Sequence, residues 1–188
     1  MPRFIADVML GSLARWLRIL GFDTIYFRAI DDNELIKIAR QQERTLLTRD
    51  TGIARRPSIK LKGGTGESAN RSKVGPDVIL IHSNSTLEQL KEVLYRLFPD
   101  SPILRFPLSD GPSFPLSGVP RCTLCNGELA ATDREAVADR IPEYVFLNAT
   151  SILTCKECGK VYWCGSHKKS IDSQLEKILD NWKHSEKD

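Results

Sequence analysis

The sequence predicts an α/β protein: a three-layer sandwich around a mainly parallel sheet, followed by a second, smaller domain. Two observations predict this fold class. Short β-type runs alternate with helical ones in the first half of the chain, and strands that are separated by helices pair in parallel through right-handed crossovers. The second half carries closely spaced pairs of cysteines. With 188 residues, the chain has room for one ordinary domain and one small one.

The first strand is expected at residues 3–7, and a helix follows it. Ser12 can cap this helix, and Gly21 is placed to end it. Between them, leucines recur at the helical spacing i, i+4 and i+7, at Leu13, Leu17 and Leu20.

The same alternation continues along the chain. A second strand is expected at 23–27, a helix at 31–43 and a third strand at 45–48, which together make a βαβαβ unit. The remaining elements are a fourth strand at 77–83, a helix at 85–98 and a candidate fifth strand at 102–106.

Composition divides the chain into two domains. Four prolines in residues 107–120 predict a semi-rigid linker, so we expect the first domain at 1–106 and the second at 121–188. Helical spacing of apolar residues near the carboxyl terminus predicts a closing helix in the second domain. Residues 57–76 are rich in Gly, Ser, Lys and Arg without periodicity, which predicts a mobile, basic surface loop.

Charge and hydropathy restrict the function classes. The net charge is +3, with 17 basic and 12 acidic residues in 1–106, so the first domain favours an anionic partner such as nucleic acid. The amino terminus has no signal-peptide core, and no apolar run is long enough for a membrane helix. We therefore expect a cytoplasmic protein with no membrane partner; nothing in the sequence sets an oligomeric state.

The cysteines have the spacing of a zinc site. Two C-x2-C pairs, each followed by a turn with glycine, can place four thiolates around a structural Zn²⁺ with no open coordination position. An odd total of five cysteines argues against disulfides in a reducing compartment. Cys164 and His167 lie close behind and could substitute for a ligand, but the paired spacing favours Cys122, Cys125, Cys155 and Cys158.

Acidic residues follow each of the first three predicted strands. Ligands of an open parallel sheet bind at the carboxyl ends of its strands, and like charges gathered there need cations, for which oxygen ligands select Mg²⁺ or Mn²⁺. We therefore predict a metal site at this edge, with Asp7, Asp32, Glu34 and Asp50 as catalytic residues and Asp7, Asp31, Asp32 and Asp50 as metal ligands.

Each acid also has a structural interpretation. Asp31 and Glu34 fit a capping box, and Asp50 can cap a short helical turn at the residues that follow it. Asp7 interrupts an apolar run, where it would be partly buried at a cost unless something pairs with it. Singly, such acids are more often structural; their coincidence at three strand ends favours a site.

An acidic metal site beside a basic surface suits metal-assisted phosphodiester hydrolysis, in which bound ions activate water and stabilise the leaving oxygen. Arginines, together with backbone amides at the start of the first helix, can hold a phosphate backbone. The candidate substrate-binding residues are Arg15, Arg18, Arg49 and Ser12, with Arg55 and Arg56 nearby.

Several segments resemble a known family. "IADVMLGSLARWLRILGFDT", "DDNELIKIA" and "LLTRD" are similar to the PIN-like ribonuclease domain of the Mut-seven C-terminal RNase family, which often carries a zinc ribbon behind it. "RCTLCNGEL", "IPEYVF" and "CKECGKVYWCGSH" resemble that ribbon.

The resemblance implies a PIN-like fold with strand order 3-2-1-4-5 and metal-dependent cleavage of RNA. By position, Asp7 matches the first acid of the family, the Asp31 to Glu34 group the second, and Asp50 the third. After the fourth strand, where relatives often have an acid, this chain has Asn84.

The sequence thus predicts a ribonuclease, and specifically an endonuclease, that uses Mg²⁺ or Mn²⁺ and carries a structural zinc. The alternative is a non-catalytic RNA- or protein-binding module with a vestigial acidic site, which Asn84 favours. A toxin of a toxin–antitoxin pair fits the fold class, but the ribbon and the chain length argue against it.

Overall fold

A computed structural model describes residues 2–56, 60–61, 75–97 and 120–163. These residues form two compact units, each with its own sheet. The predicted linker, the candidate fifth strand, the closing helix, Cys164 and His167 lie outside the described residues, so the predicted domain boundaries stay predictions.

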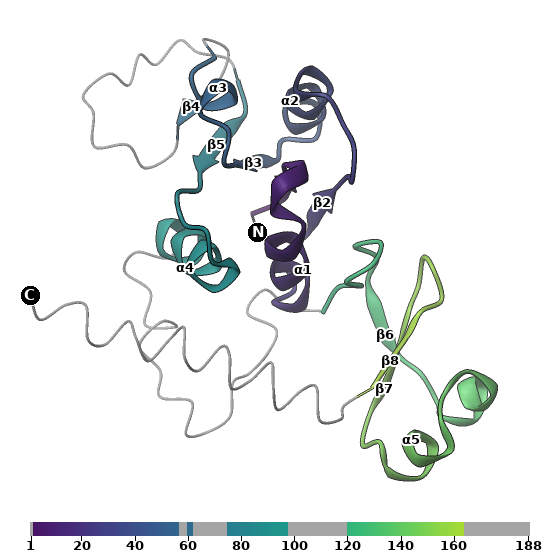
Figure 1. The fold of residues 1–188 in the computed structure, drawn as a ribbon. Coiled ribbons are helices and arrows are strands. Elements are labelled where there is room, and N and C mark those ends of the chain that lie inside the picture. Colours follow the sequence, from purple (N-terminus) through teal and green to yellow (C-terminus); the bar gives the residue numbers. More distant parts are fainter. Residues whose placement is uncertain (1, 57–59, 62–74, 98–119, 164–188) are drawn as a thin grey trace, which may run out of the picture. The chain divides into compact units, whose positions relative to one another are not determined.

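The first unit is built on a five-stranded sheet in which every pairing is parallel (Figure 1). Its strand order is β2-β1-β3-β5-β4. The α/β class with a parallel sheet is therefore confirmed. The strands are β1 (Phe4–Ala6), β2 (Thr24–Tyr26), β3 (Thr45–Thr48), β4 (Lys60–Leu61) and β5 (Asp77–Leu80).

Helices cover both faces of this sheet. Figure 1 shows α2 and α3 on one side of the strands and α1 and α4 on the other. This arrangement gives the three predicted layers. The helical elements are η1 (Val8–Leu10), α1 (Gly11–Ile19), α2 (Asp32–Gln41), α3 (Thr51–Ala54) and α4 (Thr86–Leu97).

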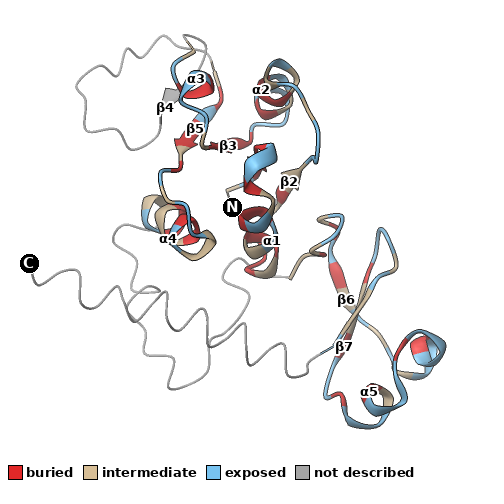
Figure 2. Cartoon of the chain, in the orientation of Figure 1, coloured by how far each residue is buried: buried red, intermediate tan, exposed pale blue. Residues whose placement is uncertain are grey.

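Alternate strand residues supply the two cores. Ile5, Leu46 and Val78 are fully buried and pack against apolar residues of α2 and α3. Their strand neighbours point to the opposite face, since side chains alternate along a strand; there the Phe4 ring meets the Phe22 ring edge-on, with centroids 5.7 Å apart. Figure 2 shows the buried strands between the helices. Such two-sided burial is typical of parallel sheets.

The strand order implied by the resemblance is wrong. Instead of 3-2-1-4-5, the chain places β1 between β2 and β3, because the crossover from β1 to β2 and the one from β2 to β3 run in opposite directions along the sheet. Right-handed crossovers then place α1 and α2 on opposite faces. The consequence is a topological switch point between β1 and β3, where open α/β sheets bind their ligands.

The predicted loop at 57–76 contains an unpredicted strand. In β4, Lys60 and Leu61 pair in parallel with Asp77 and Val78 of β5. A strand of two residues has no periodicity that a sequence could show. Its pairing partner is an edge of β5, which only the folded sheet supplies.

The second unit has an antiparallel sheet of order β6-β7-β8, from β6 (Leu129–Ala131), β7 (Ile152–Cys155) and β8 (Val161–Trp163). Two short helices, η4 (Glu135–Arg140) and α5 (Glu143–Asn148), lie between β6 and β7 in the chain. Among the described residues, one small apolar cluster packs around these helices and consists of Val137, Ile141, Val145, Ala149 and Ile152. A cluster of this size contributes little stability by itself.

Candidate active site and candidate metal centre

Asp7 and Asp50 stand at the switch point between β1 and β3. The backbone amide of Asp7 donates to the carbonyl of Leu47, 2.9 Å away, which places Asp7 beside the end of β3. Asp7 is only 6% exposed. One carboxylate oxygen accepts the amide of Val8, capping η1, and the other accepts the Thr48 hydroxyl at 2.7 Å. The predicted burial of Asp7 with a partner is confirmed.

Thr48 connects the two acidic turns. Its side chain is fully buried at the end of β3, and its Oγ1 accepts the backbone amide of Asp50 at 3.0 Å while donating to Asp7. The sequence prediction missed Thr48. One feature of the sequence could have indicated its role: a residue with a hydroxyl group stands at the last position of a buried strand, directly before the turn that carries Asp50.

Asp50 has the capping role that the structural interpretation gave it. Its Oδ1 accepts the amide of Gly52 at 2.6 Å at the start of α3. A Cβ at position 52 would lie 2.9 Å from that oxygen, so glycine permits the close approach. Asp50 is exposed, and within the described part of the chain neither Asp7 nor Asp50 forms an ion pair.

The acids after β2 are engaged locally. Asp31 caps α2 by accepting the amides of Asn33 at 2.9 Å and Glu34 at 3.1 Å. Glu34 pairs with Lys37 at 3.2 Å, one turn further along the helix. The cap at Asp31 is confirmed, but the reciprocal half of a capping box is not found, because the Glu34 carboxylate pairs with Lys37.

Asp32 is paired with an arginine from the end of α3. Arg56 donates to Asp32 at 2.8 Å and to the Asn33 side chain at 2.7 Å. Among residues 2–56, 60–61, 75–97 and 120–163, the cysteines are the only group of three or more His, Cys, Asp or Glu side chains placed to hold a metal ion. The structure therefore brings Asp7 and Asp50 to one strand junction but does not gather Asp31 and Asp32 with them into such a group.

The predicted substrate-binding residues occupy different environments. Arg49 is half-buried between Thr48 and Asp50 and donates to the side-chain oxygen of Asn84. Ser12, in the first turn of α1, and Arg15, further along the same helix, are both exposed. Arg18 is only 5% exposed, and its Nε donates to the Thr24 carbonyl at 2.8 Å. Because this bond holds β2 against α1, we do not retain Arg18 as a substrate contact.

Glu92 of α4 fixes the turn that carries Asn84. Its carboxylate accepts the amides of His82 at 3.1 Å and Ser83 at 2.8 Å. Burial alone would raise the pKa of Glu92, but the hydrogen bonds from Ser83 and His82 outweigh it and hold the pKa below its ordinary value. No local sequence pattern signals this contact, because it joins a helix to a turn.

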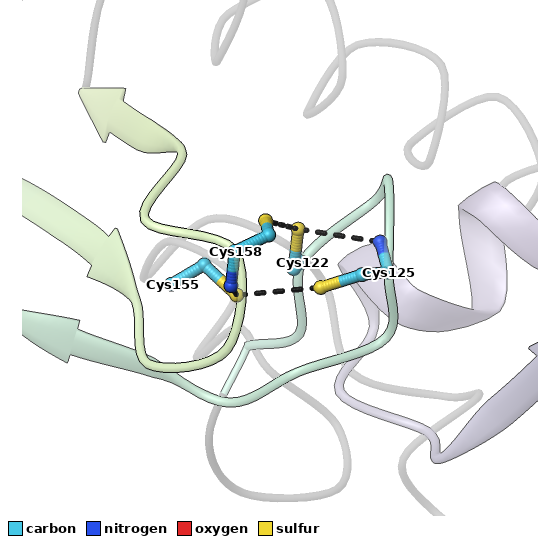
Figure 3. Close-up of side chains that lie close together, drawn as sticks. All are labelled: Cys122, Cys125, Cys155 and Cys158. Atoms are coloured by element: carbon cyan, nitrogen blue, oxygen red, sulfur yellow. Dashed lines mark hydrogen bonds between the residues drawn. The ribbon is translucent and has the colours of Figure 1, made fainter.

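Four cysteines of the second unit face one another (Figure 3). The Sγ atoms of Cys122 and Cys158 are 3.6 Å apart, and those of Cys125 and Cys155 are 3.5 Å apart. A disulfide would need about 2.05 Å, whereas a tetrahedral zinc with bonds of about 2.3 Å separates its sulfurs by about 3.8 Å. The donor set and its spacing therefore fit zinc.

Both cysteine pairs have the same backbone geometry. The amides of Cys125 and Cys158 point at the first sulfur of their own pair, each at 3.5 Å. The residues that follow, Asn126 and Gly159, both have φ of 71°, the left-handed conformation that Asn and Gly tolerate best. The tight turns predicted after each pair are confirmed.

The pKa values of two of these cysteines differ in direction. Burial alone would raise the pKa of Cys122, but hydrogen bonds from the Tyr162 hydroxyl and the Cys125 amide outweigh it and lower the pKa to about 6. Desolvation, together with the neighbouring sulfurs of Cys155 and Cys158, raises the pKa of Cys125 to about 12, against the opposing bond from the Gly127 amide. Four thiolates this close together would repel one another unless a cation neutralised them.

The fold and the site together define a class of protein. Its members combine an α/β domain that has two carboxylates at the switch point of its sheet with a four-cysteine ribbon in the same chain. A family model described as the Mut7-C RNAse domain matches residues 2–175. The chain belongs to this family, and the resemblance seen in its motifs is confirmed. Comparisons with curated proteins and with solved structures find no match. No helix in the described residues is long and apolar enough to cross a membrane.

Proposed function

We propose that this protein is a divalent-metal-dependent ribonuclease, acting as an endonuclease at the junction of β1 and β3. One observation carries the proposal: in a chain of the Mut7-C RNAse domain family, the Thr48 hydroxyl links the turns of Asp7 and Asp50 at the sheet's switch point. Carboxylates from adjacent strand ends are the ligand type that Mg²⁺ and Mn²⁺ prefer.

Asp7 and Asp50 would hold the cation. When bound, it supplies an activated water and neutralises charge on the phosphate. Thr48 acts through the two acids as a positioning residue, because its one hydroxyl fixes both turns. Asp31 stays a helix cap in this scheme, since both of its amide bonds hold the first turn of α2.

Asp32 and Glu34 would join the site only by exchanging partners. Asp32 must leave Arg56, and Glu34 must leave Lys37. Both pairs are substantially exposed, and exposed ion pairs contribute only about 0.2–1 kcal/mol. Exchange is therefore inexpensive in free energy.

Arg49 is the best-placed phosphate contact. Its neighbours in the chain are Thr48 and Asp50, and one of its guanidinium nitrogens donates a hydrogen bond to the Asn84 side chain. A guanidinium has five N–H donors, so others can reach an anionic oxygen. Arg15 and Ser12 offer further exposed contacts for the RNA backbone.

The four cysteines are proposed to bind one structural Zn²⁺. The close sulfurs, the two matching turns and the amide bonds to sulfur support this. Four thiolates fill a tetrahedron, so the ion would have no position for substrate. Its role would be to hold together a unit whose apolar clusters, in the described residues, are small.

A second candidate function is an RNA- or protein-binding module without catalysis. The pairing of Asp32 with Arg56 and the neutral Asn84 at the end of β5 favour it, because both reduce the negative charge available to a metal.

RNA digestion separates the two candidates. We expect cleavage with Mn²⁺ that EDTA abolishes and that Asp7→Asn reduces at least about 100-fold, or about 2.7 kcal/mol of transition-state stabilisation. Glu88→Gln, an exposed change on α4, serves as the control and should leave the rate unchanged. RNA binding without cleavage in the wild-type chain would instead establish the binding module.

A further inference from the structure

Tyr162 of β8 meets the first cysteine of the first pair. Its hydroxyl oxygen lies 3.0 Å from the Cys122 sulfur. The backbone amide of Thr123 donates to the same oxygen at 3.1 Å, and the Thr123 hydroxyl lies 3.2 Å away. An amide can only donate, so the tyrosine oxygen is the acceptor there and its proton can point to the sulfur. A thiolate is the stronger acceptor for that proton, since bonds to charged groups are the stronger ones.

This contact breaks the symmetry of the two pairs. Cys122 and Cys155 hold equivalent positions, and each accepts one amide from its own pair at 3.5 Å. Cys122 additionally has the tyrosine hydroxyl, whereas Cys155 has no hydroxyl partner among the described residues. Both sulfur-bearing residues are almost fully buried, so the difference lies in hydrogen bonding rather than exposure.

The rest of the tyrosine side chain is held in place. The ring packs against the small core of Cys122, Leu129 and Cys155. On its face, the ammonium of Lys160 lies 5.5 Å from the ring centroid, within reach of a cation–π contact. Replacing the hydroxyl alone should therefore leave the ring where it is.

We propose that Tyr162 is a positioning residue of the cysteine site, whose hydroxyl donates to the Cys122 thiolate and slows the loss of the bound metal. The inference rests on the proposed zinc site. Donors around a metal ligand typically contribute 10- to 100-fold to metal affinity. Here the donor also offsets part of the negative charge of four thiolates around one divalent ion.

The test uses the full chain loaded with Co²⁺ or Zn²⁺ and compares Tyr162→Phe with the wild type. We expect release to a chelator to become about tenfold faster, and the sulfur-to-cobalt charge-transfer band to shift. Tyr144→Phe is the matched control, because Tyr144 is 76% exposed and should change neither quantity.

Each outcome decides one question. Failure of the wild-type chain to bind Co²⁺ would refute the cysteine site itself. Tight binding with equal release rates and an unshifted band in Tyr162→Phe would overturn the role of Tyr162 alone. A second measurement needs no substitution: in the cadmium-loaded wild type, the Tyr162 hydroxyl proton should show scalar coupling to the metal, and its absence would also overturn the proposal.

Discussion

The cysteine site and the carboxylate site differ in the hydrogen-bond and charge partners that their side chains already have. The four sulfurs lie within 4.8 Å of one another, an arrangement that fits a cation between them. Each carboxylate already has a local partner: an amide and a hydroxyl for Asp7, an amide for Asp50 and a guanidinium for Asp32. A cation at the acidic edge would therefore compete with these partners, whereas a cation at the cysteines would have no charged partner to displace among the described residues.

Removing the metal from the cysteines should have the largest effect. Chelation, or Cys155→Ser, should unfold the second unit, because the apolar clusters among its described residues are small and the proposed metal would supply folding free energy. Hydrogen exchange would show lost protection at Leu129–Ala131 and retained protection at Phe4–Ala6. Cys164→Ser should preserve both protection and metal content; a loss of zinc in that variant would contradict the choice of ligands.

Asp50→Asn separates the charge of Asp50 from its capping role. Asparagine caps helices about as well as aspartate, so thermal stability should change little. Loss of the charge should lower kcat/KM on RNA at least about 100-fold, equivalent to about 2.7 kcal/mol. Unchanged cleavage with unchanged stability would show that Asp50 is a cap and nothing more.

Thr48→Val tests the link between the two acidic turns. The change keeps the shape but leaves the buried Asp7 oxygen and the Asp50 amide without their partner, which should cost about 1–3 kcal/mol of stability. Misplaced ligands should also reduce kcat by about 10- to 100-fold. Thr48→Ser, which keeps the hydroxyl, should recover most of the rate. A valine variant that is destabilised but fully active would refute the positioning role.

Glu92 should make stability depend on pH below neutrality. Its pKa in the folded chain lies below the ordinary 4.5, so its contribution is present above the unfolded pKa and is lost as pH falls through the folded pKa. Denaturant unfolding from pH 7 downward measures this. Glu92→Gln should flatten the acid limb of the curve, and an identical pH dependence in that variant would exclude the effect.

Arg56→Gln should produce the smallest change. It frees Asp32 from an exposed ion pair worth about 0.2–1 kcal/mol. If Asp32 joins the metal site, Mn²⁺ affinity measured by calorimetry without RNA should rise by about 1.4- to 5-fold. No change in affinity would place Asp32 outside the site.

Local patterns in the sequence were enough for several features. The helical spacing located α1 and α2, and the Asp31 cap and the glycine turns after the cysteine pairs were predicted correctly. The predicted Ser12 cap was wrong, because Ser12 lies inside α1 (Gly11–Ile19) and the preceding turn is capped by Asp7. Asp7 could be identified as a buried acid that needs a partner, because a charge within an apolar run is costly to bury alone. Its partner Thr48, 41 residues away, could not be identified, since nothing local marks which hydroxyl will face it.

The sequence by itself determined the α/β class, the four-cysteine site and the acids at strand ends, because each depends on residues close together in the chain. Only the tertiary structure decided that β1 lies between β2 and β3, that Thr48 hydrogen-bonds both Asp7 and Asp50, and that Arg56 forms an ion pair with Asp32. These contacts depend on the direction in which each crossover runs along the sheet, because that direction decides which distant segments lie together. No local pattern in the sequence specifies it.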